Sequence, residues 1–154
     1  MNIGVISDTH SLVRPEALAA LEGCELIIHA GDIGSPNVLD ALRVIAPVVA
    51  VRGNIDKGPW AEELPDTDVI RADGALIYVL HNLNEIDLNP AAAQMHAVIA
   101  GHSHEPSVAT KAGVLYVNPG SAGPRRFKLP VAVARMNVTG SNVTADLVLL
   151  DVGV

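Results

Sequence analysis

The sequence is poor in cysteine and in aromatic side chains. Its single cysteine, Cys24, cannot form an internal disulfide, which argues against the disulfide-built proteins of oxidising compartments. Aromatic residues make up 3% of the 154 residues and hydrophobic residues 49%, so the core must consist mainly of Val, Ile, Leu and Ala. Because many of these residues are β-branched and lie in short runs, the composition favours a sheet over a helical bundle.

Positive charge is also scarce. Ten basic and 17 acidic residues give a formal net charge of −7. General binding to nucleic acids or anionic membranes is therefore disfavoured, because phosphate-rich surfaces attract clustered Lys and Arg. A small phosphorylated substrate is still compatible, because bound divalent ions would dominate the local field. The N-terminus shows no basic segment and no long apolar run, so we expect no signal peptide, no transmembrane helix and a cytoplasmic location.

The order of apolar runs predicts an α/β fold. We expect strands at 2–7, 25–30 and 47–52, and helices between them at 14–23 and 35–45, the second with Ser35 as N-cap. This order implies parallel strands with right-handed crossovers. The second half predicts one helix at 89–96, a hairpin turn at 139–142, and strands at 68–73, 74–80, 97–100, 113–118, 130–137 and 142–150. Together they predict one layered domain over residues 1–154, with two sheets packed face to face and helices outside.

Polar side chains follow five of the predicted strands. The segments are Asp8-Thr9-His10, Gly31-Asp32, Gly53-Asn54, His81-Asn82 and Gly101-His102-Ser103-His104. Ligands of parallel sheets bind at the carboxyl ends of the strands. If these five strands lie side by side in one direction, the five segments converge on one rim of the sheet.

The residue types at these strand ends are metal ligands. Two carboxylates, one amide and four imidazoles give seven candidates: Asp8, Asp32, Asn54, His10, His81, His102 and His104. Seven ligands exceed the capacity of one ion, whereas two ions that share a bridging carboxylate would use all of them. The mixed nitrogen and oxygen set suits Mn, Fe, Co, Ni or Zn, with Mn favoured, and is too rich in nitrogen for Mg or Ca.

Each segment alone also has a structural explanation. Gly-Asp and Gly-Asn are common turn dipeptides, and a lone His81 is typical of a structural histidine. The coincidence of all five segments at strand ends favours the metal site. The remaining two histidines are left out of it. We interpret His29 as buried and structural, or as hydrogen-bonded to a ligand carboxylate, and His96 as the polar end of a helix.

In their order along the chain, DTH (8–10), GD (31–32), GN (53–54), His81 and GHSH (101–104) resemble the calcineurin-like metallophosphoesterases. The short length, NPGS at 118–121 and the strand-rich C-terminus resemble the small prokaryotic phosphodiesterase branch. The resemblance implies a four-layer αββα sandwich of two mixed sheets flanked by helices, with a dinuclear metal centre. It implies that the first ion is held by Asp8, His10 and His104, and the second by Asn54, His81 and His102. Asp32 would bridge both ions.

The resemblance also implies a metal-dependent phosphoesterase, in which a hydroxide bridging the ions attacks phosphorus in line. We assign Asp32, Asn54 and His81 to catalysis as well as to metal binding. Many relatives carry a histidine after Gly-Asn that is proposed to protonate the leaving group, and here that position is Ile55. A site of small net positive charge without a strong acid favours phosphodiesters.

Two other functions remain as alternatives: phosphomonoester hydrolysis, and a non-catalytic scaffold or binding protein on the same fold. A doubly wound nucleotide-binding domain is disfavoured, because no G-x-G-x-x-G or P-loop follows the first strand. Arg14, Arg125 and Arg126 are candidate phosphate contacts, with solvated surface arginines as the alternative. Trp60 either lines the substrate pocket or caps the core, and Asn118, Gly120 and Ser121 are expected to shape a turn near the site. A homodimer through an apolar patch is a further option.

Overall fold

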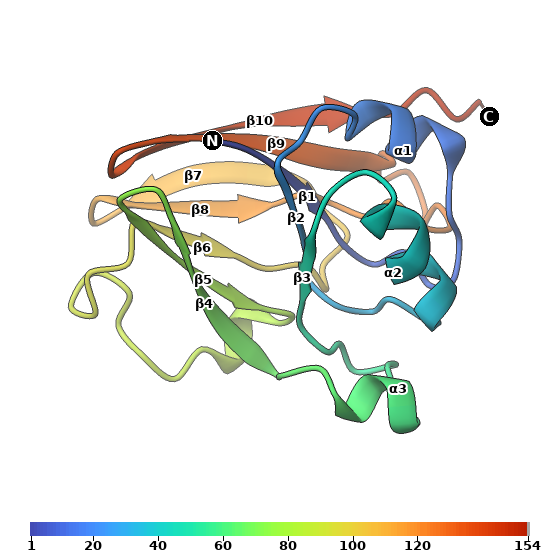
Figure 1. The fold of residues 1–154 in the computed structure, drawn as a ribbon, viewed down its shortest axis with the longest axis horizontal. Helices are drawn as coiled ribbons and strands as arrows, with labels where there is room; N and C mark the ends of the chain where they lie inside the picture. The colour runs from blue at the N-terminus through green and yellow to red at the C-terminus, as the bar shows by residue number, and fades with distance from the viewer. Residues whose placement is uncertain (154) are drawn as a thin grey trace.

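Two five-stranded mixed β-sheets form the centre of the computed structural model, which describes residues 1–153 (Figure 1). Val154, the last residue of the predicted domain, lies outside the described residues. The first sheet has the order β10-β9-β1-β2-β3. Its strands are β1 (Asn2–Ile6), β2 (Leu26–His29), β3 (Val48–Ala50), β9 (Ala132–Thr139) and β10 (Asn142–Leu149). β1, β2 and β3 run parallel, as predicted, and β9 and β10 extend the sheet as an antiparallel hairpin through the predicted turn.

The second sheet has the order β4-β5-β6-β8-β7. Its strands are β4 (Thr67–Ala72), β5 (Ala75–Leu80), β6 (Ala97–Ile99), β7 (Ser107–Lys111) and β8 (Val114–Asn118). β5, β6 and β8 are parallel, whereas β4 and β7 are antiparallel edge strands. The five strands that are followed by candidate ligands therefore lie in two different sheets. β1, β2 and β3 belong to the first sheet, and β5 and β6 belong to the second. The condition that these five strands lie side by side is wrong, and their ends meet across the two sheets instead.

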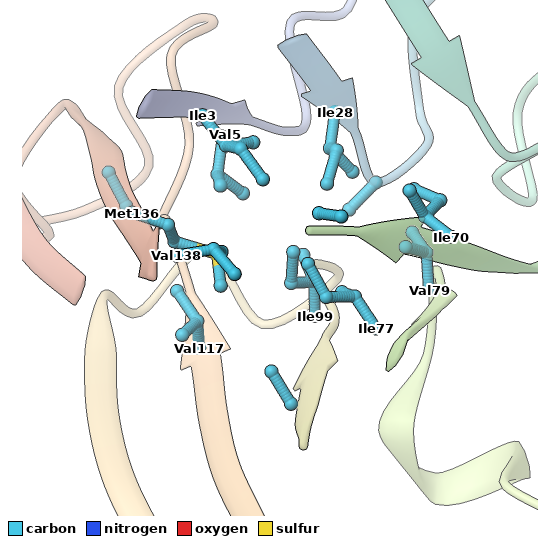
Figure 2. Close-up of a cluster of buried hydrophobic side chains, with 14 of the residues drawn as sticks. Ile3, Val5, Ile28, Ile70, Ile77, Val79, Ile99, Val117, Met136 and Val138 are labelled. Atoms are coloured by element: carbon cyan, nitrogen blue, oxygen red, sulfur yellow. The ribbon is translucent and has the colours of Figure 1, made fainter. Parts of the chain in front are cut away.

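The core lies between the sheets and is aliphatic, as the composition predicts. Figure 2 shows Ile3, Val5 and Ile28 of the first sheet facing Ile77 and Ile99 of the second. All of the buried members of this cluster are Ala, Val or Ile, apart from one methionine. β-Branched side chains pack well on pleated surfaces, so the two inner faces interlock without aromatic rings.

Helices cover the outer face of the first sheet. α1 (Pro15–Ala20) and α2 (Pro36–Arg43) pack Leu39, Leu42 and neighbouring side chains on a second apolar cluster. Each begins with a proline at its first turn, where a missing N–H costs nothing. Ser35 stands at the N-cap of α2 with extended backbone, but its hydroxyl bonds the Asn37 side chain rather than a backbone N–H. A short α3 (Pro59–Glu62), which the sequence pattern did not predict, follows β3.

The outer face of the second sheet is covered differently. Residues 83–95 cross it as a 3₁₀ turn (Leu83–Glu85) and irregular turns, and they pack Leu83, Ile86 and Met95 against Tyr78 and Leu80. The predicted helix at 89–96 is therefore wrong. Gln94 has a left-handed backbone, with φ of 61°, which ends the single turn formed after Asn89. The predicted four-layer sandwich is present, but its fourth layer is thin. Within residues 1–153 no helix is long and apolar enough to cross a membrane.

Candidate metal centre

The candidate ligands lie on loops with an unusual backbone. Five of them have positive φ: Asp8 (55°), His10 (47°), Asp32 (55°), His102 (72°) and His104 (62°). Non-glycine residues adopt this left-handed region rarely and at a cost, and such residues cluster at functional sites. The loops after β1, β2 and β6 therefore hold these ligand residues in a backbone conformation that is unfavourable for residues other than glycine.

Backbone hydrogen bonds hold these loops together. The N–H of Asp8 donates to the carbonyl of Gly31 at 3.0 Å, and the N–H of His10 donates to the carbonyl of Asp32 at 3.0 Å. The N–H of Gly101 donates to the carbonyl of His81 at 3.0 Å. The first two of these bonds join the ends of β1 and β2, and the third joins the ends of β5 and β6. The first sheet thus carries the ligand loops after β1, β2 and β3, and the second sheet carries those after β5 and β6.

Two glycines allow the loops to approach closely. A Cβ at Gly53 would lie 2.1 Å from the backbone nitrogen of Asp32. A Cβ at Gly101 would lie 2.0 Å from Oγ of Ser7 and 2.6 Å from Oδ2 of Asp8. Both distances are far below van der Waals contact. These positions require glycine because neighbouring backbone and carboxylate groups fill the space of a side chain.

Asp8 is the most deeply placed carboxylate of the site. Its Oδ2 accepts hydrogen bonds from the Ser7 hydroxyl at 2.7 Å and from the His102 N–H at 3.0 Å. Its Oδ1 is buried and has no hydrogen-bond partner in the described residues. Around that oxygen lie the Nε2 atoms of His104 at 3.3 Å and of His10 and His81, each at 3.9 Å. Two ligands each about 2.1 Å from one ion lie roughly 3–4 Å apart, so this spacing fits a shared metal ion.

Asp32 faces the same space from the neighbouring strand end. Its Oδ1 accepts the N–H of Ile55 at 3.2 Å, while its Oδ2 lies 3.6 Å from His10 Nε2 and 3.4 Å from His81 Nε2. Burial raises the pKa of Asp32, but the hydrogen bond and charge of His81 outweigh it and hold that pKa below its usual value. Asp32 is therefore an ionised carboxylate with one oxygen between two imidazoles.

His81 presents one defined ring nitrogen to the site. Its Nδ1–H donates to the carbonyl of Ala30 at 2.7 Å, which leaves the lone pair of Nε2 facing the carboxylates. A backbone carbonyl that fixes the tautomer in this way is common behind metal-ligating histidines. Burial lowers the pKa of His81, but Asp32 and Asp8 act in the opposite direction and raise it overall.

The structure brings the seven candidates together in two neighbouring groups. Asp8, His10 and His104 offer atoms that all lie within 4.8 Å of one another, and Asp8, Asp32 and His81 form a second such group. His102 adjoins the second group, with Nδ1 3.3 Å from His81 Nε2. Asn54 is exposed and lines the same hollow as His81 and His102. All seven predicted ligands thus surround one region.

Some supporting residues were missed by the sequence pattern. Asp56 is 3% exposed and accepts three backbone hydrogen bonds, from Ile33 at 3.1 Å, Gly34 at 2.9 Å and Gly53 at 2.9 Å. It therefore ties the loop after β2 to the loop after β3. The signal in the sequence is a carboxylate two residues after Gly53-Asn54, and an aspartate in that place is also typical of an ordinary turn.

The NPGS segment supports the site from the other side. Asn118 Nδ2 donates to the Gly101 carbonyl at 3.1 Å and to Ser103 Oγ at 3.0 Å, and its Oδ1 accepts the N–H of Gly120 at 2.9 Å. The Ser121 hydroxyl donates to the carbonyl of Asp8 at 3.0 Å. These bonds make the expected turn near the site.

The candidate substrate contacts separate into two kinds. Arg125 and Arg126 line a hollow of about 190 Å³ together with His10 and His104. Arg14 instead donates to the carbonyl of Gly123 from Nε at 3.3 Å and from Nη2 at 3.2 Å. Trp60 packs on the apolar cluster beneath the helices, so of its two expected roles the structure supports the one in the core.

Neither of the two excluded histidines joins the ligands. His29 is fully buried, accepts the N–H of Gly31 on Nδ1 at 3.1 Å and pairs with Thr9 Oγ1 through Nε2 at 3.0 Å. It bonds no ligand carboxylate, and its structural role is the one observed. His96 does not end a helix, because the residues before it form turns, and its Nδ1 accepts the N–H of Leu76 at 2.9 Å.

Acid should destabilise the fold through His29. Burial, with the neighbouring charge of His81, lowers the pKa of His29 from 6.5 to about 3. Between about pH 6.5 and pH 3, His29 is therefore protonated in the unfolded chain but neutral in the folded chain. As the pH falls through this range, the free energy of unfolding decreases by about 1.4 kcal/mol per pH unit. Urea denaturation of wild type and His29→Gln, both with chelator, from pH 7 to pH 4 measures this. The variant should show the smaller slope, and parallel slopes would contradict the assignment.

The arrangement defines a class of protein. Residues 1–141 match the model of the calcineurin-like phosphoesterase superfamily domain, and the chain belongs to that family. It is 32% identical to a probable metallophosphoesterase of Methanothermobacter thermautotrophicus, over 96% of this chain and 92% of that protein.

Solved structures share the fold. A novel archaeal phosphodiesterase matches with a TM-score of 0.79 and 23% identity, over 96% of this chain and 100% of that one. Vps29 of Entamoeba histolytica complexed with Zn²⁺ matches with a TM-score of 0.76 and 22% identity, over 97% and 99% of the two chains. The predicted family and fold are thus confirmed.

Proposed function

We propose that this protein is a metal-dependent phosphodiesterase with a dinuclear centre, acting as a single domain over residues 1–154. Asp8, His10 and His104 would hold the first ion, and Asn54, His81 and His102 the second. Asp32 would bridge the two. The observation that carries the proposal is the buried Oδ1 of Asp8, which has no hydrogen-bond partner among residues 1–153 and faces three imidazole nitrogens.

The residues present fit a pair of transition-metal ions. Buried polar atoms without a hydrogen bond are costly. Asp8 Oδ1 and His10 Nε2 have no partner within the described part of the chain, and bound ions would supply one. The donors are imidazole nitrogen and carboxylate or amide oxygen, which suit Mn, Fe, Co, Ni or Zn. Mn is the favoured ion, and the Zn²⁺ in the Entamoeba Vps29 structure makes zinc the first alternative.

When bound, two such ions supply a water of lowered pKa as the nucleophile and stabilise charge on the phosphoryl oxygens. The chain's own residues set the geometry around them. Asp32 Oδ2 lies between His10 and His81, one histidine from each proposed ion, which supports its bridging role. Its lowered pKa keeps it ionised and able to bind both.

One residue beside the ligands, Ile55, favours a diester, whereas Arg125 and Arg126 would bind the phosphoryl group of either ester. Arg125 and Arg126 adjoin His10 and His104 and would bind the anionic phosphoryl group on that side. Ile55 is 41% exposed directly after Asn54 and cannot donate a proton to a leaving group. A diester carries one negative charge fewer than a monoester and suits a site of small net positive charge.

A cytoplasmic location, a small phosphorylated substrate and a homodimer stay predictions.

Removal of metal should abolish hydrolysis. Exhaustive chelation is expected to reduce turnover of bis(p-nitrophenyl) phosphate to background, and Mn²⁺ or Ni²⁺ should restore it with about two ions bound per chain. p-Nitrophenyl phosphate should be the poorer substrate. Full activity after chelation would rule out the metal mechanism, and a preference for the monoester would overturn the diester assignment.

The second candidate is a non-catalytic binding protein on this fold, which the likeness to Vps29 favours. The filled ligand set argues for catalysis instead, because none of the seven positions carries a residue unable to bind metal. Less than one equivalent of bound metal and no turnover of either ester under Mn²⁺ or Ni²⁺ would support the binding protein.

A further inference from the structure

A hollow of about 250 Å³ lies on the outer face of the second sheet, beside the candidate ligand His102. Its walls include Val98 of β6 and Tyr116 of β8, which are paired across these neighbouring strands, and Ala100, which directly follows β6. Val98, Ala100 and Tyr116 belong to the apolar cluster of this outer face. The hollow therefore has an aliphatic and aromatic base built on rigid strands.

The thin fourth layer explains why this hollow exists. Residues 83–95 pack on the outer-face cluster as turns rather than as a regular helix, and Tyr116 of β8 is only partly buried beside them. Leu83 and Asn84 form one wall, and Ser107, at the start of the edge strand β7, forms the opposite one. A packed helix in this layer would fill the space.

The hollow adjoins the candidate metal centre. Asn82 and His102 line it, and the same two residues line the hollow that contains Asn54 and His81. A phosphoryl group at the second proposed ion could therefore carry its organic substituent past His102 into this space. On the opposite side of the centre, the hollow with Arg125 and Arg126 is basic and has a different chemistry.

Polar groups stand at the rim above the apolar base. Ser103 Oγ accepts hydrogen bonds from Asn118 Nδ2 at 3.0 Å and from the Glu105 N–H at 3.2 Å, so its own hydrogen remains to be donated. Asn82 Oδ1 accepts the N–H of Asn84 at 3.1 Å, so its amide hydrogens can also reach a ligand. An apolar base with a few polar groups at the rim is typical of small-molecule sites.

We propose that this hollow, which we call the ring subsite, binds the organic substituent of the phosphoester. The substituent would be a flat aromatic ring with polar edge atoms, either an aryl group or a nucleobase. The volume is below the range of about 300–1,000 Å³ usual for a whole drug-sized ligand, so the ring subsite holds one ring system and not the entire substrate. This inference rests on the proposed phosphoesterase function.

Ser107→Trp tests the ring subsite without touching a metal ligand. Ser107 is exposed, pairs with Asn118 and lines the hollow, so an indole there fills it. Thr110→Trp is the matched control, because Thr110 is exposed on the same strand and does not line the hollow. Calorimetry on metal-loaded protein measures the affinity for inorganic phosphate, ribose 5-phosphate, phenyl phosphate and AMP.

Wild type and Thr110→Trp should bind phenyl phosphate or AMP at least about 10-fold more tightly than ribose 5-phosphate. Ser107→Trp should lose this preference and keep the wild-type affinity for inorganic phosphate. Tighter binding of AMP than of phenyl phosphate identifies a nucleobase as the preferred ring, and the reverse order identifies an aryl group.

Equal affinity of wild type for AMP, phenyl phosphate and ribose 5-phosphate would overturn the ring subsite, as would a retained preference in Ser107→Trp. The proposed phosphoesterase function would survive either result if bis(p-nitrophenyl) phosphate is still hydrolysed. Absence of both phosphate binding and hydrolysis in wild type would instead overturn the function, and the ring subsite with it.

Discussion

Asp32→Asn should lower phosphodiester hydrolysis by at least about 10²-fold while the fold persists. Even the loss of an outer hydrogen-bonding partner costs a metal site 10–100-fold, and Asp32 is proposed to bind both ions directly. The amide has no charge to share between His10 and His81, whose nitrogens lie 3.6 and 3.4 Å from Asp32 Oδ2. Steady-state kinetics and metal analysis of the purified variant measure the loss.

The matched control for this variant is Asp40→Asn. Asp40 is a surface residue of α2 whose side chain is 74% exposed, so its replacement should leave activity and metal content unchanged. Wild-type turnover in Asp32→Asn, or loss of only one of the two ions, would contradict the bridging assignment. Circular dichroism of both variants checks that the fold is intact.

Gly53→Ala should reduce activity about 10²-fold although it adds a single methyl group. The new Cβ would lie 2.1 Å from both the backbone nitrogen and Oδ1 of Asp32, so one of the loops must move by about an ångström. A misplacement of this size at a reacting centre can cost about 10²-fold. The loop cannot move freely, because the Gly53 N–H donates to Asp56 at 2.9 Å.

Gly113→Ala separates this clash from the ordinary effect of replacing glycine. Gly113 has φ of 78° and no atom within 4 Å of an added Cβ, so its replacement costs only backbone strain, about 1–2 kcal/mol. The control should be less stable in thermal unfolding and fully active. A Gly53→Ala protein with wild-type kcat/KM would mean that the loops after β2 and β3 are not packed as described.

The sequence was sufficient to predict the strands that carry ligands, because each is a short aliphatic run that ends in a polar residue. β7 could not be predicted in the same way, since all five of its side chains are exposed and it has no apolar alternation. The segment at 89–96 has helix-forming residues, yet it is short, and a few residues cannot offset the cost of nucleating a helix without packing. Its Ala-rich composition was misleading for that reason.

The ligand set was predictable from residue type and position, whereas its support was not. Asp8 and His102 are recognisable because they follow strands, but the hydrogen bond between Asp8 Oδ2 and the His102 N–H joins residues 94 apart in the chain. Asp56 likewise serves three N–H groups from two loops, of which only one is near in sequence. Contacts between sheets depend on the packing of the whole core, which no local pattern contains.

The single tryptophan gives the chain one indole fluorophore, which can be excited selectively over the two tyrosines, and its position decides what its emission reports. Trp60 packs on the cluster beneath α1 and α2. The core between the two sheets contains no aromatic side chain within the described residues. Emission from Trp60 will therefore follow the detachment of the helical layer, while a separation of the two sheets that leaves this layer in place will not change the surroundings of Trp60.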